Sequence, residues 1–196
     1  MSTPACSRRR LLRAGLASGS GLLAATLGVA SAHAEPDQDR ELLRQALTDE
    51  QMLVVAYATA LGRRGVPRRA QLVLGHIREQ EIEHAQALLT ALRERGDRAP
   101  APPSPGAPDS LVPGLSRARS PRALLNYLLE LETVVAHRHA GRVQRLIDDA
   151  LIRISASVLG NEAQHVAMLR ELLGLDPLAV ALEVGLAPPA PPGAVR

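Results

Sequence analysis

Two short stretches, Glu81-Ile82-Glu83-His84 and Glu162-Ala163-Gln164-His165, repeat the pattern Glu-x-x-His within a chain of 196 residues. A glutamate and a histidine three residues apart lie on the same face of an α-helix. About thirty residues before each stretch, Glu50 or Glu132 occupies another segment with apolar residues at helical spacing. Four carboxylates and two imidazoles on four helices are the ligand set of a dinuclear metal site inside a bundle. The two stretches therefore predict a fold and a candidate site together.

Four amphipathic segments carry these residues. The spacing predicts helices over 37–62, 67–95 and 121–146, and a fourth that starts at Asp148 or Asp149 and ends near 173. Asp37 or Asp39 is the predicted cap of the first helix, and Ser120 with Pro121 the start of the third. Phe and Trp are absent, and a core of Leu, Val, Ala and Ile with few β-branched runs favours helices. We expect an all-α four-helix bundle in residues 35–175.

The two halves of the predicted bundle resemble each other. Equivalent residues are separated by 81 or 82 positions. The equivalent pairs are Leu42-Leu43 with Leu124-Leu125, Glu50 with Glu132, Glu81 with Glu162, His84 with His165, and Tyr57 with His139. One helical hairpin cannot bury its own apolar stripe, whereas two related by a pseudo-twofold axis can. The repeat thus predicts two hairpins that bring their ligands to a shared centre.

Proline marks the segments outside the helices. Residues 96–120 contain six prolines, at 100, 102, 103, 105, 108 and 113, so we expect an extended connector rather than a helix. Such a crossover would join second and third helices that run parallel to each other. At about 3.1 Å per residue in an extended, Pro-rich form, the connector is long enough to run the length of the bundle. The Pro-rich tail, residues 176–196, is predicted to be disordered.

The chemistry of the predicted ligands favours a metal. A carboxylate on a buried stripe costs several kcal/mol unless it is paired, neutralised or metal-bound. No arginine lies on these stripes to pair with the glutamates, and carboxylate and imidazole ligands suit Fe, Mn or Zn. The single cysteine, Cys6, lies outside the predicted bundle, which excludes thiolate ligands from it.

Some ligand assignments have alternatives. Glu130 competes with Glu132 for the role on the third helix, and the repeat and the apolar stripe favour Glu132. Tyr57 is expected either to hydrogen-bond a ligand or simply to pack in the core. His139, at the equivalent place, is a candidate outer contact or extra ligand.

Residues 1–34 have the pattern of an export signal. The stretch Ser7-Arg8-Arg9-Arg10-Leu11-Leu12-Arg13 resembles a twin-arginine motif, and a weakly apolar stretch follows it over 14–30. Ala32-His33-Ala34 is a small-x-small cleavage site. We expect recognition by twin-arginine export machinery and a periplasmic, extracellular or cell-envelope location. An uncleaved signal that anchors the chain in the membrane is the less favoured alternative.

The charge of the chain reflects that N-terminal segment. The formal net charge is +3, but four of the 23 basic residues, all arginines, lie in the first 34 positions, which contain no acidic residue. Without them, 19 basic residues face 20 acidic ones, a balance of −1. No basic stripe with aromatic residues is present, so nucleic acid is not an expected partner.

The chain resembles the ferritin-like superfamily over about residues 37–174. The stretch Leu159-Gly160-Asn161-Glu162-Ala163-Gln164-His165 and the Glu50-Gln51 … Tyr57 pattern carry this resemblance. In character it is similar to exported, actinobacterial-type ferritin-like domain proteins related to desiccation-associated proteins. The resemblance implies an up-down-down-up bundle with a di-iron or di-manganese centre. The implied ligands are Glu50, Glu81, His84, Glu132, Glu162 and His165, with Glu50 and Glu162 terminal and Glu81 and Glu132 bridging.

Three functional interpretations follow. The first is a di-metal oxidoreductase, ferroxidase-like or peroxidase-like, that oxidises Fe(II) or reduces O2 or peroxide. The second is a metal-binding or iron-storage protein without turnover of its own, and the third is a structural, stress-associated bundle of the cell envelope. Assembly into a homo-oligomer is compatible with each, because superfamily membership does not determine function.

Overall fold

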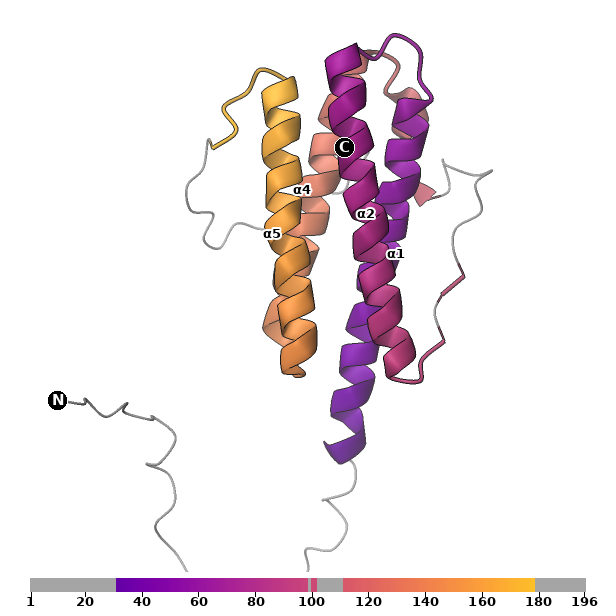
Figure 1. Cartoon of the computed structure of the whole chain (residues 1–196), viewed down its shortest axis with the longest axis vertical. Coiled ribbons are helices and arrows are strands. Elements are labelled where there is room, and N and C mark those ends of the chain that lie inside the picture. The colour runs from indigo at the N-terminus through magenta and orange to yellow at the C-terminus, as the bar shows by residue number, and fades with distance from the viewer. Residues whose placement is uncertain (1–30, 99, 102–110, 179–196) are drawn as a thin grey trace, which may run out of the picture.

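The structure is a computed structural model that describes residues 31–98, 100–101 and 111–178 (Figure 1). Four long helices dominate it: α1 (Ser31–Leu61), α2 (Arg68–Glu94), α4 (Pro121–Arg145) and α5 (Asp149–Leu172). A short 3-10 helix, η1 (Leu115–Arg117), precedes α4, and these residues contain no β-strand. The predicted all-α four-helix bundle is confirmed. Among the described residues, no helix has the length and apolar character needed to cross a membrane.

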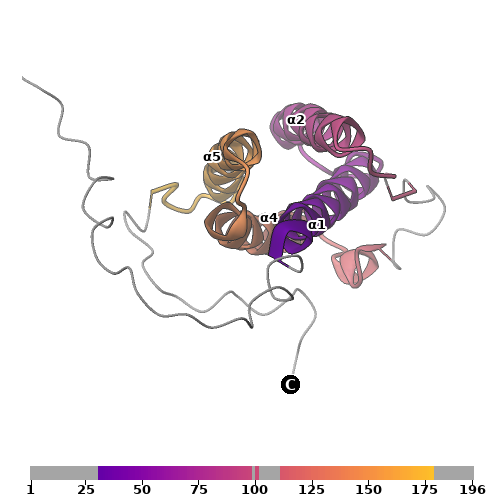
Figure 2. The ribbon, with the colours of Figure 1, turned by 90° about the horizontal axis from the view of Figure 1, so that it is seen from below.

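The helices form two antiparallel hairpins, α1–α2 and α4–α5, in an up-down-down-up arrangement (Figure 1). Helices α2 and α4 therefore run parallel, as the long crossover between them requires. The end-on view shows α1 beside α4 on one side of the bundle, with α2 and α5 on the other (Figure 2). One hairpin thus contributes α1 and α2, and the other α4 and α5, to a common interior.

The observed helix ends agree with the local signals for α4 and α5. Ser120 Oγ accepts a hydrogen bond from the Ala123 amide at 3.1 Å, and Pro121 occupies the first turn. Asp148, rather than Asp149, caps α5, because its carboxylate accepts from the amides of Ala150 and Leu151. Such caps stabilise a helix by satisfying amides that have no partner within it.

The predicted start of α1 is wrong. The helix begins at Ser31, so neither Asp37 nor Asp39 caps it. Asp39 is instead buried, and its carboxylate accepts hydrogen bonds from the amides of Ile147 and Asp148 before α5. The last residues of the predicted signal, 31–34, therefore continue the helix, whereas residues 1–30 lie outside the described part of the chain.

The apolar core is divided into two clusters along the bundle axis. One cluster contains Leu53, Tyr57, Leu74, Leu128 and Leu169 among others. The second contains Leu43, Leu47, Leu88, Leu92 and Leu151 among others. On α1, α2 and α5, the predicted ligands lie between the segments that supply the two clusters. The candidate site is thus a polar layer with packed hydrocarbon above and below it.

The end of the crossover is not an extended connector, contrary to the prediction for residues 96–120. Val112 and Leu115 are fully buried in the core, and Gly114 takes a left-handed conformation with φ +91°. The Arg63 guanidinium donates to the carbonyl oxygens of Leu115 at 2.7 Å and Ala118 at 2.8 Å. Residues 111–120 contain only one proline, Pro113. The tendency of proline to keep a chain extended is therefore weak there, and the apolar side chains pack into the core.

A buried ion pair that the sequence analysis missed joins α1 to α4. Arg142 donates to Asp49, whose carboxylate also accepts from Arg138 at 2.7 Å. Arg142 and Asp49 are each only 6% exposed. The pair neutralises a carboxylate adjacent in sequence to Glu50 and fixes α1 against α4 at that level. No arginine is found among the charge partners of the six predicted ligands within the described residues.

Replacement of Leu115 by alanine tests the packing of the crossover. We expect Leu115→Ala to lower the free energy of unfolding by about 2–5 kcal/mol, because it leaves a cavity in the core. The matched control is Leu72→Ala on α2, where the leucine is 60% exposed; its effect should remain within about 0.5 kcal/mol. Chemical denaturation followed by circular dichroism measures both, and equal small effects would contradict the buried position of Leu115.

Candidate metal centre

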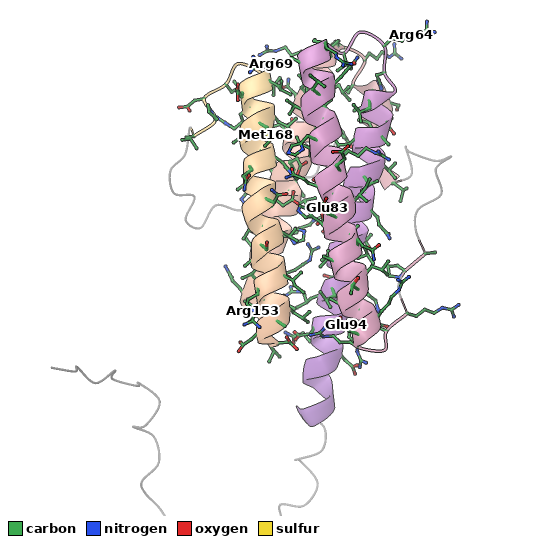
Figure 3. The ribbon with its side chains drawn as sticks, in the orientation of Figure 1. Arg64, Arg69, Glu83, Glu94, Arg153 and Met168 are labelled. Carbon is green, nitrogen blue, oxygen red and sulfur yellow. The ribbon has the colours of Figure 1, made fainter. Side chains whose placement is uncertain are left out.

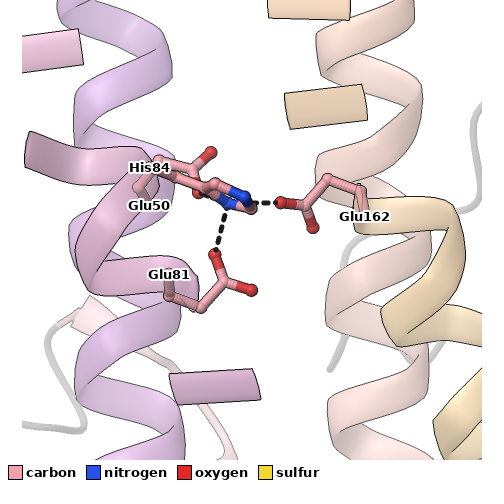
Figure 4. A group of neighbouring side chains, drawn as sticks. All are labelled: Glu50, Glu81, His84 and Glu162. Atoms are coloured by element: carbon pink, nitrogen blue, oxygen red, sulfur yellow. Dashed lines mark hydrogen bonds and ion pairs between the residues drawn. The ribbon is translucent and has the colours of Figure 1, made fainter. Parts of the chain in front are cut away.

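The six predicted ligands meet in the middle of the bundle, one or two from each helix. They are Glu50 on α1, Glu81 and His84 on α2, Glu132 on α4, and Glu162 and His165 on α5. Five are fully buried, and the side chain of His84 is 12% exposed. Figure 4 shows Glu50, Glu81 and His84 facing Glu162 across the interior. Glu130 is exposed, so the alternative ligand on α4 is excluded by its position.

The ligand atoms fall into two groups. One consists of Glu50, Glu81, His84 and Glu162, and the other of Glu81, Glu132, Glu162 and His165. Within each group, one donor atom from every residue lies within 4.8 Å of the others. Each group could hold a cation, and the two groups share Glu81 and Glu162.

The grouping differs from the ligand roles that the resemblance implies. Glu162 belongs to both groups, whereas Glu132 belongs only to one. If each group held an ion, Glu81 and Glu162 would be the bridging residues, and Glu50 and Glu132 would be the terminal ones. The reason is the helix arrangement: the two Glu-x-x-His stretches lie on α2 and α5, which are neighbours on one side of the bundle (Figure 2).

Both histidines direct Nδ1 toward the carboxylates. His84 Nδ1 lies 3.2 Å from Glu50, 3.2 Å from Glu162 and 3.4 Å from Glu81. His165 Nδ1 lies 2.9 Å from Glu81 and 3.7 Å from both Glu132 and Glu162. The two rings are stacked with centroids 5.9 Å apart and an angle of 28° between their planes. Each imidazole thus offers the same nitrogen to its own group of carboxylates.

Tyr57 and His139 hold the two terminal carboxylates across the hairpins. The Tyr57 hydroxyl donates to Glu132, and His139 Nε2 lies 2.6 Å from Glu50 Oε1. Both side chains are fully buried. Each follows the terminal glutamate of its own helix by seven residues, yet contacts the terminal glutamate of the other hairpin. His139 belongs to neither group of candidate ligands. We call Tyr57 and His139 outer contacts, because each hydrogen-bonds to a candidate ligand.

Gln80 is a contact that the sequence analysis did not identify. Its side-chain oxygen lies 3.0 Å from His165 Nε2, the nitrogen that points away from the carboxylates. The two residues are on different hairpins, 85 positions apart, so the local sequence gives no signal for the pair. Its position directly before Glu81 was the only indication that Gln80 lies near the centre.

Burial and mutual repulsion oppose ionisation of the carboxylates unequally. Burial raises the pKa of Glu81 to about 7, although hydrogen bonds with His165 and His84 act against it. Burial, and then the charges of Glu81 and Glu162, raise the pKa of Glu132 well above its ordinary value. Burial also acts to raise the pKa values of Glu50 and Glu162, but bonds with histidines outweigh it and lower both.

The neighbouring carboxylates stabilise the charged form of both histidines. Burial lowers the pKa of His84, but the carboxylates of Glu162, Glu50 and Glu81 outweigh it and raise that pKa to about 12. Burial is likewise outweighed at His165, whose pKa rises to about 11. Without a metal, the layer is thus neutralised by protons. A cation that binds Nδ1 must displace them, so metal binding becomes more favourable as the pH rises toward these values.

The donor set fits divalent cations. Six buried atoms of the ligands lack a hydrogen bond of regular geometry among the described residues: both oxygens of Glu81 and of Glu162, Glu132 Oε2 and His165 Nδ1. Several of them still lie within ion-pair distance of one another, as His165 Nδ1 does of Glu81 at 2.9 Å. Each unsatisfied buried atom costs about 1–3 kcal/mol. Two divalent cations would balance four carboxylates and use these lone pairs, and oxygen with imidazole ligands suits Fe, Mn or Zn. The residues present are therefore compatible with metal ions.

A four-helix bundle with a central layer of glutamates and histidines is the arrangement in which carboxylate-bridged metal sites are built. The family model of the ferritin-like domain matches residues 38–175. The chain therefore belongs to the ferritin-like domain family, and the resemblance to the ferritin-like superfamily is confirmed.

A solved structure agrees with this fold. The crystal structure of a conserved hypothetical protein, rv2844, from Mycobacterium tuberculosis aligns with a TM-score of 0.57 at 18% sequence identity. The alignment covers 76% of this chain and 100% of that chain. At this identity the likeness concerns the fold alone. A comparison with curated proteins finds no match.

Removal of single glutamates tests the shared role of Glu162. We expect about two metal ions per wild-type chain, about one in Glu50→Ala or Glu132→Ala, and close to none in Glu162→Ala, because Glu162, like Glu81, serves both groups. Anaerobic loading with Zn(II), desalting and mass spectrometry count the ions, and circular dichroism verifies folding. One ion retained in folded Glu162→Ala would contradict the assignment.

Proposed function

We propose that this protein binds two iron ions, with manganese as the alternative, and oxidises Fe(II) or reduces O2 or peroxide. The supporting observation is the buried layer of four carboxylates and two imidazoles between two apolar clusters, in which no arginine is a charge partner of the carboxylates among the described residues. Glu50 and His84 would hold one ion and Glu132 and His165 the other, with Glu81 and Glu162 between them. Bound iron would supply the electrons for the reduction of O2 or peroxide.

The protein residues would hold and enclose this centre. Tyr57 and His139 would orient the terminal carboxylates through the hydrogen bonds that they make. The apolar clusters on both sides exclude water from the layer along the bundle axis. His84 is the only one of the six candidate ligands with an exposed side-chain fraction above zero. The α2 side is therefore the side from which Fe(II), O2 or peroxide would reach the layer.

Oxygen consumption tests the proposal. We expect anaerobically loaded wild-type protein to consume O2 when Fe(II) is supplied, and the double variant Glu81→Ala/His84→Ala to lose metal binding and consumption together. The control is Glu83→Ala, whose exposed side chain lies on the same helix (Figure 3) and which should behave as wild type.

The outcomes separate the functional classes. Two bound ions without O2 or peroxide consumption would contradict the oxidoreductase and favour metal binding without turnover. A high particle mass in size-exclusion chromatography would then favour iron storage in an assembly. Absence of any bound metal would leave the structural, stress-associated bundle of the cell envelope.

We further propose that twin-arginine machinery exports the chain to the periplasm or the cell envelope. The supporting residues are the arginine run before the apolar stretch and the Ala32-His33-Ala34 site. We expect replacement of Arg8, Arg9 and Arg10 by lysine to retain the protein in the cytoplasm, because the machinery reads the arginine pair. Fractionation of cells that express both forms measures this, and equal export of the two would contradict a twin-arginine route.

A further inference from the structure

The two candidate metal positions differ in how their histidines are held. A histidine that binds a metal through Nδ1 carries its proton on Nε2, and it generally donates that proton to an oxygen acceptor. At His165 the acceptor is present, since Gln80 Oε1 lies 3.0 Å from Nε2 and the ring is fully buried. At His84 no hydrogen bond to Nε2 is found within the described residues, and the side chain is 12% exposed.

The internal repeat shows why only one histidine has such a partner. The residue equivalent to Gln80, 81 positions later, is Asn161, which precedes Glu162 as Gln80 precedes Glu81. Asparagine is shorter than glutamine by one methylene group. Gln80 reaches across from α2 to His165 on α5, whereas no bond joins Asn161 to His84 in the described part of the chain. The difference between two amides at one repeat position thus breaks the symmetry of the layer.

The terminal glutamates do not share this asymmetry. Glu132 receives a hydrogen bond from Tyr57, and Glu50 is bonded to His139, so each terminal carboxylate has one outer contact. Glu81 and Glu162 belong to both groups of candidate ligands. The terminal contacts thus differ in side-chain type but not in number, whereas Nε2 of His165 has an acceptor and Nε2 of His84 has none among the described residues.

We propose that Gln80 is a positioning residue that makes the two metal positions unequal, so that the position at His165 binds its ion more tightly than the position at His84. Gln80 does not contact the ion. Its carbonyl oxygen fixes the ring and directs the Nδ1 lone pair inward, while the open ring at His84 rotates more freely. The His84 position is then the one that exchanges ions with solvent. This inference rests on the proposed dinuclear site but not on its redox activity.

Anaerobic Co(II) titration, followed by the visible absorption of the ion, tests the inference without any turnover. Wild-type protein should bind one Co(II) tightly and a second more weakly, and a chelator should remove them in a fast and a slow phase. We expect Gln80→Leu to weaken the tight site by about 10- to 100-fold, the usual effect of losing such an outer contact. Gln80→Glu restores an acceptor and should restore tight binding.

A substitution at Asn161 provides a test by gain of binding. Asn161→Gln should supply the missing acceptor, tighten the weaker site and bring the two release phases together. Gln164→Leu is the matched control, since this exposed glutamine next to His165 should leave both sites unchanged. Glu132→Ala, which removes the His165 position alone, identifies which phase belongs to which site.

The results distinguish this inference from the proposed function. Two Co(II) ions of equal affinity in wild-type protein, or equal weakening of both sites by Gln80→Leu in a protein with unchanged circular dichroism, would overturn the inference and leave the dinuclear site standing. No Co(II) binding at all would overturn the inference and the proposed function together. Two unequal sites that respond to Gln80 and Asn161 as described would support it.

Discussion

The interior of this bundle must accommodate four carboxylates in a layer between two hydrocarbon clusters. Such a layer is unfavourable unless positive charge enters it, because burial penalises each anion and the anions repel one another. In the protein alone, protons on the two histidines supply that charge, and the pKa values of both rings rise accordingly. The helices, their stripes and their order all serve to hold this layer at one level. The same constraint makes the layer a natural place for divalent cations.

The internal repeat organises the contacts around the layer. Tyr57 and His139 occupy equivalent positions, and each bonds to the terminal glutamate of the opposite hairpin. The hairpins are therefore joined at the centre by reciprocal hydrogen bonds as well as by apolar packing. Since these residues differ in chemistry, as do Gln80 and Asn161, the twofold relation holds for the backbone and the ligands but not for their surroundings.

Much of this arrangement could be predicted from the sequence because the signals are local. The Glu-x-x-His spacing indicates which face of the helix points into the bundle. The caps at Ser120 and Asp148 depend only on residues next to them in the sequence. The burial of Leu115, the bridging position of Glu162 and the Gln80–His165 contact depend on how distant segments meet, and spacing along one helix does not contain that information. The start of α1 was missed because Ala32-His33-Ala34 suits a cleavage site and a helix equally well.

The two ends of the bundle are fastened differently. At the end that contains Glu94 and Arg153 (Figure 3), the buried Asp39 accepts hydrogen bonds from the loop before α5. Asp148 caps α5 and also accepts a hydrogen bond from Arg95, the residue directly after α2, at 2.8 Å. At the opposite end, α2 and α5 are linked by Arg69 and Glu171, both largely exposed, an ion pair that salt screens readily. Raising the ionic strength therefore weakens this charge contact more than it weakens the hydrogen bonds of the buried Asp39 at the other end.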